Sequence, residues 1–294
     1  MTEPTAAPTI DPVNEAAYVV DQRRPHWPST IDGFIAASAE VATRPGFTGD
    51  LRYGAHPRQA FDWYATSGEA RGVVAYFHPG YWQMRDRTLM RCLMPVFAHL
   101  GFDVATVGYP LCPDASLADL TDSARAAVPA LLAHARTVRG RDLPIVAAGH
   151  SAGGHLAVEL AVTDWGARGL SPSPIAGVVA LSGVYDLEPL VATSLNIALR
   201  LDAASARAAS PLHRVPTGGP PALFAVGGAE TAAFLAQNRD MAAAWRAAGN
   251  PTRDLESPDD DHFSLILRLM DPASPIHRAV ADLLDEAVPR PAAG

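Results

Sequence analysis

Short apolar runs alternate with amphipathic stretches along most of the chain. The apolar runs have the length of buried strands, and the stretches between them have the period of surface helices. The predicted strands cover residues 51–53, 60–64, 73–77, 104–107, 145–148, 178–181, 222–226 and 252–255. The predicted helices cover residues 89–100, 117–137, 155–163 and 232–248. This alternation predicts an α/β protein whose mostly parallel, eight-stranded sheet carries helices on both faces, with the first two strands as an antiparallel pair.

The pattern also suggests how the chain is divided. A length of 294 residues suits one domain with a sizeable core, or one domain with a small cap. We expect residues 1–45 to form a tail with a possible cap helix at 30–42 over the site, and residues 46–294 to form the main domain. The alternation stops at residues 186–221, a candidate cap insertion whose exit linker is rich in Pro and Gly.

A G-x-S-x-G pentapeptide at residues 149–153 carries Ser151 between a predicted strand and a helical run. Glycines let the backbone turn sharply, and a strand before and a helix after are the context of a nucleophile elbow. We therefore interpret Ser151 as a catalytic nucleophile. The alternative is an ordinary strand-to-helix turn.

An acid and a histidine follow Ser151 in the order that an α/β-hydrolase requires. Glu230 comes just after the predicted strand 222–226, and His262 lies on a loop beyond the last strand. His262 would act as general base and then as general acid, while Glu230 would fix its tautomer and stabilise the imidazolium.

Other acids compete with Glu230 for this role. Glu230 itself could simply start the helix at 232–248, where an acid suits the helix dipole. Three aspartates at residues 259–261 are rival acids, but they adjoin His262 in sequence and fit a solvated turn.

Other histidines compete for the role of the base. His213 precedes the acid, and His277 falls in a final helical stretch after the last predicted strand rather than on a strand-end loop. His150 and His155 flank the nucleophile turn, and we expect them to pack around it, since the base must approach from another loop.

A loop after the strand 73–77 is the candidate oxyanion hole. It reads H-P-G-Y-W at residues 78–82, a variant of an H-G-G-G-type loop. Backbone N–H groups stabilise an oxyanion, and the expected donors are Gly80, Tyr81 and Ala152. Pro79 has no N–H, but it occupies a position that need not donate. The alternative is an aromatic surface loop.

Several motifs together resemble one family. They are H-P-G-Y-W-Q at 78–83, Y-P-L-C-P at 109–113, G-H-S-A-G-G-H at 149–155, S-G-V-Y-D-L-E-P-L at 182–190 and D-H-F at 261–263. They resemble kynurenine formamidase (arylformamidase), among the hormone-sensitive-lipase-like α/β-hydrolases, from about residue 53 to residue 267. The stretch 227–234 is similar to the one that bears the family's acid, which again indicates Glu230. Two departures are Pro79, where the family has glycine, and Glu230, where some members have aspartate.

The resemblance implies an α/β-hydrolase fold and a metal-free serine hydrolase that cleaves N-formyl arylamines such as N-formylkynurenine through a formyl-enzyme. Tyr81, Trp82 and Tyr185 are then candidates to line the pocket for the aromatic leaving group, or else they pack in the core. One alternative function is a carboxylesterase acting on small acyl or aryl esters with the same triad. The other is a non-catalytic binding protein on the same fold.

Composition and charge restrict the partners. A net charge of -8 argues against nucleic acid, and no apolar run is long enough to span a bilayer. Residues 1–12 show no signal-peptide pattern, so we expect a cytoplasmic protein with a small aromatic substrate; a homodimer is an open possibility. Cys92 and Cys112 would then be free thiols rather than a bridge. No metal-binding pattern is present, and we expect no cofactor.

Overall fold

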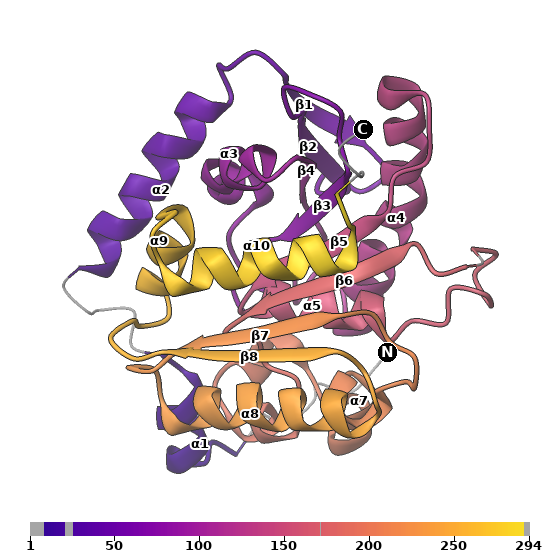
Figure 1. Ribbon diagram of the computed structural model, residues 1–294. Coiled ribbons are helices and arrows are strands. Elements are labelled where there is room, and N and C mark those ends of the chain that lie inside the picture. Colours follow the sequence, from indigo (N-terminus) through magenta and orange to yellow (C-terminus); the bar gives the residue numbers. More distant parts are fainter. Residues whose placement is uncertain (1–8, 21–25, 171, 291–294) are drawn as a thin grey trace.

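The computed structural model describes residues 9–20, 26–170 and 172–290, and its centre is a single twisted sheet (Figure 1). The eight strands have the order β1-β2-β4-β3-β5-β6-β7-β8. Pairs β1/β2 and β2/β4 are antiparallel, and all other neighbours are parallel. The strands are β1 (Phe47–Arg52), β2 (Ala60–Tyr64), β3 (Gly72–Phe77), β4 (Phe102–Val107), β5 (Ile145–His150), β6 (Ile175–Leu181), β7 (Ala222–Gly227) and β8 (Thr252–Ser257). The predicted sheet is confirmed.

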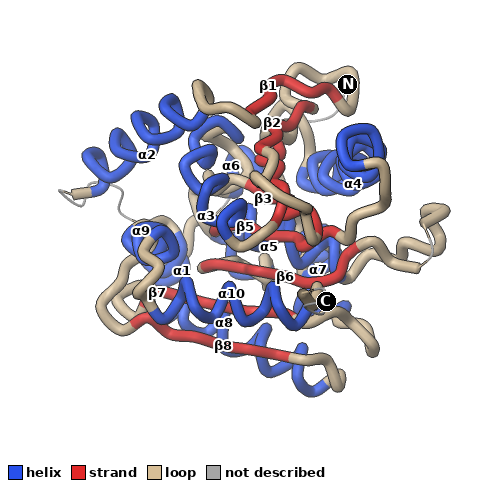
Figure 2. The backbone as a smooth tube through the Cα atoms, turned by 45° about the horizontal axis from the view of Figure 1, so that its top comes forward, coloured by secondary structure: helices blue, strands red, loops and turns tan. Residues whose placement is uncertain are grey.

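Helices cover both faces of this sheet (Figures 1 and 2). The α-helices are α1 (Pro12–Tyr18), α2 (Trp27–Val41), α3 (Met94–His99), α4 (Leu117–Arg139), α5 (Ala152–Ala161), α6 (Asn196–Leu199), α7 (Ala203–Ala208), α8 (Ala232–Ala247), α9 (Ser264–Met270) and α10 (Pro275–Ala287). Shorter 3₁₀ turns are η1 (Arg87–Leu93), η2 (Glu188–Ala192) and η3 (Pro211–Arg214).

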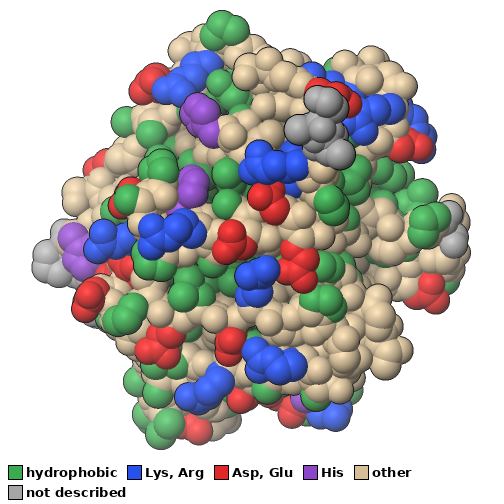
Figure 3. All heavy atoms as spheres, in the orientation of Figure 1, with side chains coloured by type: hydrophobic (Ala, Val, Ile, Leu, Met, Phe, Trp, Pro, Cys, Tyr) green, Lys and Arg blue, Asp and Glu red, His purple; other side chains and the backbone are tan. Residues whose placement is uncertain are grey.

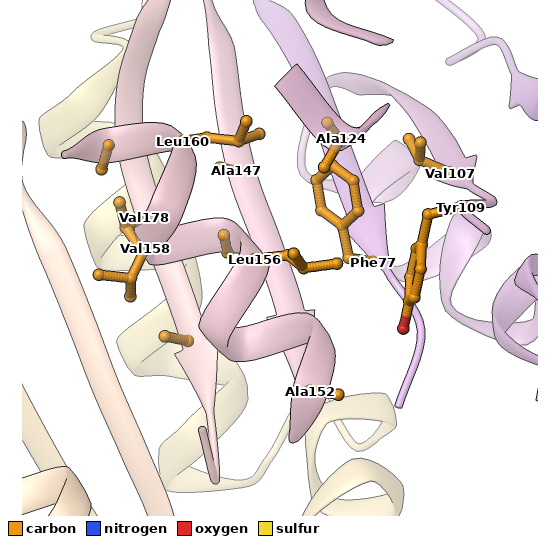
Figure 4. Close-up of a cluster of buried hydrophobic side chains, with 14 of the residues drawn as sticks. Phe77, Val107, Tyr109, Ala124, Ala147, Ala152, Leu156, Val158, Leu160 and Val178 are labelled. Atoms are coloured by element: carbon orange, nitrogen blue, oxygen red, sulfur yellow. The ribbon is translucent and has the colours of Figure 1, made fainter. Parts of the chain in front are cut away.

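The sheet separates two hydrophobic cores. Along β3, Val73, Ala75 and Phe77 face the core that holds α4, α5 and α8. Val74 and Tyr76 face the other core, which holds α2, α3, α9 and α10. Successive strand residues point to opposite faces, so a strand that is buried on both faces reads as a continuous apolar run. Figure 4 shows side chains of α5 packed against this sheet in the first core.

Boundaries shifted where the local sequence is not apolar. The first strand begins at Phe47 rather than at residue 51, and its register breaks between Thr48 and Leu51. Asp50 has a φ of 57° at this irregularity. A bulged edge strand with polar residues lacks the clean alternation that sequence reading depends on. The predicted helix 89–100 divides into η1 and α3, and proline occupies the first turn of α3.

The two regions expected as caps take the following places. The segment between β6 and β7 contains η2, α6, α7 and η3, and its Leu187, Leu190 and Leu199 are buried in the first core. The helix expected at 30–42 is α2, which packs along η1 and buries Phe34 in the second core.

Two further observations concern the surface and the thiols. Figure 3 shows arginines and acidic side chains interspersed on the face that carries α10. Within the described ranges, no helix is both long and apolar enough to cross a membrane. Cys92 and Cys112 are free, as expected. Both are also buried, and burial raises the pKa of each thiol to about 11.

Candidate active site

Ser151 lies on a tight turn that joins β5 to α5. Its φ of 57° and ψ of -121° are far from helix or strand values, and its N–H donates to the Leu181 carbonyl at 2.8 Å. Both flanking glycines are required by close backbone approach. A Cβ on Gly149 would lie 2.2 Å from the Gly153 carbonyl oxygen, and one on Gly153 would lie 2.0 Å from the Phe77 oxygen. The turn therefore holds a strained serine at the carboxyl edge of the sheet.

Glu230 and His262 meet at the same edge. His262 Nδ1 lies 2.6 Å from Glu230 Oε2, and the two side chains are 6% and 2% exposed. The other carboxylate oxygen, Oε1, accepts the Gly227 N–H at 3.0 Å and the Ser182 hydroxyl. Because a carboxylate accepts, Nδ1 carries the proton in this pair, which leaves Nε2 as the free acceptor of the imidazole.

The rival acids are engaged elsewhere. Asp261 accepts from Trp27 Nε1 at 3.0 Å and contacts His26 Nε2 at 2.7 Å. Asp260 accepts from Arg268 Nε at 3.1 Å, and Asp259 is exposed. The hydrogen bonds recorded for His262 Nδ1 within the described ranges thus involve Glu230 and none of these aspartates.

The rival bases also have other neighbours. His277 lies in α10, where its Nδ1 donates to the Leu269 carbonyl at 2.9 Å. His213 lies within 3.6 Å of Glu188 and 3.8 Å of Asp186. His213, Glu188 and Asp186 are close enough together to hold a metal ion, but none of them lines the pocket that contains Ser151.

Ser151 and His262 open onto one narrow pocket of about 20 Å³. Its remaining lining residues are Val20, Trp27, Pro79, Gly80, Tyr81, Met84, Arg85 and Phe263. Sequence reasoning named Pro79, Gly80 and Tyr81 in the loop after β3 and Phe263 in the D-H-F motif, but it missed the rest. Val20 and Trp27 come from the N-terminal region, and Trp27 is the point where α2 reaches the site. No local motif could have indicated residues that are distant in sequence and joined only by folding.

The loop after β3 places free N–H groups in this pocket. Gly80, Tyr81 and Trp82 have φ values of 129°, 51° and 59°, all in the left-handed half of conformational space. A Cβ on Gly80 would lie 2.2 Å from the Met84 oxygen, so this position requires glycine. The N–H groups of Gly80 and Tyr81 donate to no described residue. Ala152 opens α5, where first-turn N–H groups lack partners within the helix.

Two of the three residues expected to line an aromatic pocket lie elsewhere. Trp82 and Tyr185 are fully buried in the first core, and neither lines the pocket beside Ser151. Trp82 packs edge-on to His155, and Tyr185 packs edge-on to Phe224. Trp82 and Tyr185 therefore pack in the core, which was the alternative interpretation. Both follow a strand end closely, so their burial depended on how the loops fold back.

The third aromatic residue, Tyr81, does line the pocket, but its hydroxyl points to the N-terminal region. It donates to the Tyr18 carbonyl at 2.8 Å and accepts the Val20 N–H at 3.2 Å. Burial raises the pKa of this phenol to about 12, so it stays neutral. Tyr81 therefore ties the oxyanion loop to residues 18–20.

Buried histidines support the site from behind. His78 stacks on Tyr109 with ring centroids 4.2 Å apart, and its Nδ1 donates to the Pro79 carbonyl at 2.8 Å. The His150 ring lies 4.4 Å from that of His262. Burial lowers the pKa of His78 to about 4 and the pKa of His150 and His155 below the usual range. All three are neutral near pH 7, which for His150 and His155 fits the expected packing role.

These histidines predict an acid-sensitive fold. The folded pKa of His78 is about 4 against 6.5 in the unfolded chain, so the unfolded chain binds more protons between these values. The contribution of His78 to the free energy of unfolding is therefore complete above about pH 6.5 and declines as the pH falls toward 4. From His78 alone we expect a loss on the order of 2 kcal/mol at pH 5. Urea unfolding between pH 7.5 and 4.5 measures it.

A matched control for this experiment is the exposed His99. His99→Gln should leave the dependence of stability on pH as it is in the native protein. A free energy of unfolding that stays constant from pH 7.5 to 4.5 would contradict the expectation.

Ser182 is a site residue that sequence reasoning did not single out. It follows β6 directly, has a φ of 47°, and donates its hydroxyl to Glu230 Oε1. Its N–H donates to the Ala225 carbonyl at 2.7 Å, which fixes it at the end of β7. Its place in the motif at residues 182–190, directly after a parallel strand, was the available signal, since carboxyl ends of parallel strands meet at one edge.

The fold and this edge of the sheet define an enzyme of the α/β-hydrolase class. The sequence pattern of the alpha/beta hydrolase fold family matches residues 74–265. A kynurenine formamidase of Danio rerio is 30% identical over 229 residues, or 76% of this chain and 76% of that protein. The chain therefore belongs to the alpha/beta hydrolase fold family and, within it, to the kynurenine formamidase family. It is a hydrolase of the arylformamidase or esterase type.

Solved structures agree with this placement. A candidate thioesterase of Silicibacter sp. TM1040 is 28% identical, with a TM-score of 0.75 over 88% of this chain and 95% of that chain. A bacterial esterase of the hormone-sensitive lipase family shares the fold, with 23% identity and a TM-score of 0.65 over 88% of this chain and 97% of that chain. The expectation of an enzyme is confirmed, and the alternative of a non-catalytic binding protein is set aside.

Proposed function

We propose that this hydrolase cleaves N-formyl arylamines, such as N-formylkynurenine, to formate and the aryl amine. Ser151 is the nucleophile, His262 the general base and Glu230 the acid that orients it. The observation that carries the proposal is the buried His262–Glu230 pair of 2.6 Å, whose imidazole opens onto the same pocket as Ser151. The N–H groups of Gly80, Tyr81 and Ala152 are the proposed oxyanion donors.

The reaction has two halves. Ser151 Oγ attacks the formyl carbon while His262 Nε2 takes its proton, and the carbonyl oxygen becomes an oxyanion. The C–N bond then breaks, His262 returns the proton to the departing amine nitrogen, and a formyl-enzyme remains. Water loses a proton to His262, attacks the formyl carbon and releases formate, which restores the Ser151 hydroxyl.

The size of the pocket supports a small acyl group. A cavity needs roughly 10–15 Å³ to hold one water molecule. The space beside Ser151 is about 20 Å³. A formyl group is the smallest acyl group and matches this space, whereas a benzoyl group does not. The aryl part would lie toward Met84, which is 39% exposed and marks the solvent side of the pocket.

A screen across matched substrates tests the proposal. Formanilide and phenyl formate share the acyl group, while acetanilide and phenyl acetate enlarge it by one methyl group. We expect kcat/KM to be highest for the formyl compounds and the formamide to be turned over. A preference for acetyl or longer esters, with no hydrolysis of any formamide, would instead favour the carboxylesterase.

That second function has its own support. The structural relative with 28% identity is described as a candidate thioesterase, and esters and amides share triad chemistry.

We also propose a cytoplasmic location, because two buried free thiols suit a reducing compartment. The proposed partner is an aromatic small-molecule substrate.

Pro79 should not weaken this chemistry. The left-handed turn begins at Gly80, and Pro79 is not among the residues with positive φ, so proline fits its position without strain. It also removes no N–H that the proposed oxyanion hole uses. We expect Pro79→Gly to keep kcat/KM within about tenfold, a barrier change of roughly 1.4 kcal/mol or less. Steady-state kinetics on one formamide and one ester measure this.

A large gain would contradict that expectation. If Pro79→Gly raised formamidase activity about a hundredfold, roughly 2.7 kcal/mol, the native loop would be distorted for this reaction. The family's glycine would then be required for its conformation.

A further inference from the structure

Arg85 lies at the mouth of the pocket that contains Ser151 and His262. It lines that pocket, and it also lines a neighbouring groove of about 480 Å³ between α2 and η1. Its backbone is fixed, because its φ is 72° and its carbonyl accepts a hydrogen bond from Arg58 Nη2 at 2.6 Å. The backbone of Arg85 is thus anchored where the active site meets a larger recess.

The guanidinium of Arg85 differs from those of its neighbours. Arg58 pairs with Asp86 at 3.2 Å, and Arg91 pairs with the fully buried Asp62 at 2.8 Å. The Arg85 guanidinium, by contrast, donates to no described residue and pairs with no described acid. Burial lowers the pKa of Arg85, and no nearby acid offsets this. A partly buried cation without a counter-ion is unfavourable unless a ligand supplies one.

Two acids in this region are already engaged: Asp86, which is next in sequence, and Asp261, which precedes His262. Asp86 lines the same groove, but it accepts the Thr88 N–H at 3.0 Å and pairs with Arg58. Asp261 accepts from Trp27 and from the N–H groups of Phe263 and Ser264. Neither carboxylate is recorded in contact with Arg85.

We infer that Arg85 binds an anionic group of the substrate, a carboxylate carried by the leaving group, and thereby selects acidic aryl substrates over neutral ones. This inference rests on the proposed function, because it takes Ser151 as the point of attack. With the formyl group in the narrow pocket, the leaving group extends past Met84 toward Arg85. A guanidinium can hold a carboxylate through two parallel N–H···O bonds, which gives direction as well as charge.

Two substrates that differ only in the carboxylate test this inference. They are N-formylkynurenine and its decarboxylated analogue, compared in the native enzyme, Arg85→Gln and Arg85→Lys. The quantity measured is the kcat/KM for N-formylkynurenine divided by that for the decarboxylated analogue. We expect Arg85→Gln to lower this ratio at least tenfold, mainly by raising the KM for N-formylkynurenine. Arg85→Lys keeps the charge but loses the planar fork, so its ratio should fall less.

A matched control removes the same charge far from the site. Arg253 on β8 is exposed and pairs with Glu286 of α10 at 2.8 Å. Arg253→Gln should leave the ratio within about twofold of native, which separates local binding from general electrostatic attraction. Thermal unfolding of each variant confirms that it is folded.

The outcomes separate the inference from the function on which it rests. A ratio that Arg85→Gln leaves unchanged, while both formamides are hydrolysed, overturns the role of Arg85 alone. If no formamide is hydrolysed, the formamidase proposal fails, and the same ratio is measured with 4-acetoxybenzoate over phenyl acetate. A tenfold fall there still supports Arg85 as the anion site, and an unchanged ratio overturns it.

Discussion

Ser151→Ala is expected to lower kcat by a factor on the order of 10⁶ on every substrate that the native enzyme hydrolyses. The variant keeps the turn but has no nucleophile, so neither the acyl-enzyme nor its hydrolysis is accessible. Its stability should stay within about 0.5 kcal/mol of native. The reason is that the Ser151 hydroxyl makes no hydrogen bond to a described residue, and alanine differs from serine only by lacking that hydroxyl.

The measurement has two parts. Hydrolysis of formamides and esters is followed with purified protein, and labelling by a fluorophosphonate probe reports the nucleophile directly. We expect the native enzyme to be labelled and Ser151→Ala not to be. Activity that persists in a correctly folded, unlabelled variant would show that another residue performs the attack.

Glu230→Gln is expected to lower kcat about 10⁴-fold. Glutamine keeps the size of the side chain, but it cannot stabilise the imidazolium and can stabilise the wrong tautomer of His262. Both carboxylate oxygens of Glu230 accept hydrogen bonds, from Gly227, Ser182 and His262, whereas the amide of glutamine has only one oxygen that can accept. Steady-state kinetics of the purified variant measure the loss.

The three neighbouring aspartates provide matched controls. Asp259→Asn should be close to native, because Asp259 is exposed. Asp260→Asn should mainly affect stability, because that carboxylate holds Arg268 and Ser257. Asp261→Asn should have a moderate effect, because Asp261 holds Trp27, which lines the pocket. A loss in any of these that exceeds the loss in Glu230→Gln would mean that the acid is misassigned.

Sequence reading succeeded best where strands are buried on both faces. The runs that became β3, β5 and β7 are apolar throughout, and they are confirmed within a residue or two at each end. It was less accurate at β1, which is bulged and half exposed, and at η1, whose 3₁₀ geometry has no clear pattern. The hydrophobic period reports burial, so it loses its signal where an element is only partly buried.

The candidate site shows the same division. Ser151, Glu230 and His262 stand one, three and five residues after the ends of β5, β7 and β8, and the structure brings them to one edge of the sheet. Trp82 and Tyr185 also follow strands, yet they turn into the core. A residue's place in the chain order specifies which edge it reaches, whereas the direction of its side chain depends on loop dihedrals and on packing partners.

By itself, the sequence determined the sheet, the order of the candidate triad and the family, because each depends on local pattern or on motifs within a few residues. Only the tertiary structure decided what surrounds the triad. Val20 and Trp27 reach the pocket from the N-terminal region, Ser182 supports Glu230 across the sheet edge, and Arg85 is left without a counter-ion. Such contacts join residues tens to hundreds of positions apart, and they exist only once hydrophobic burial has brought the elements together.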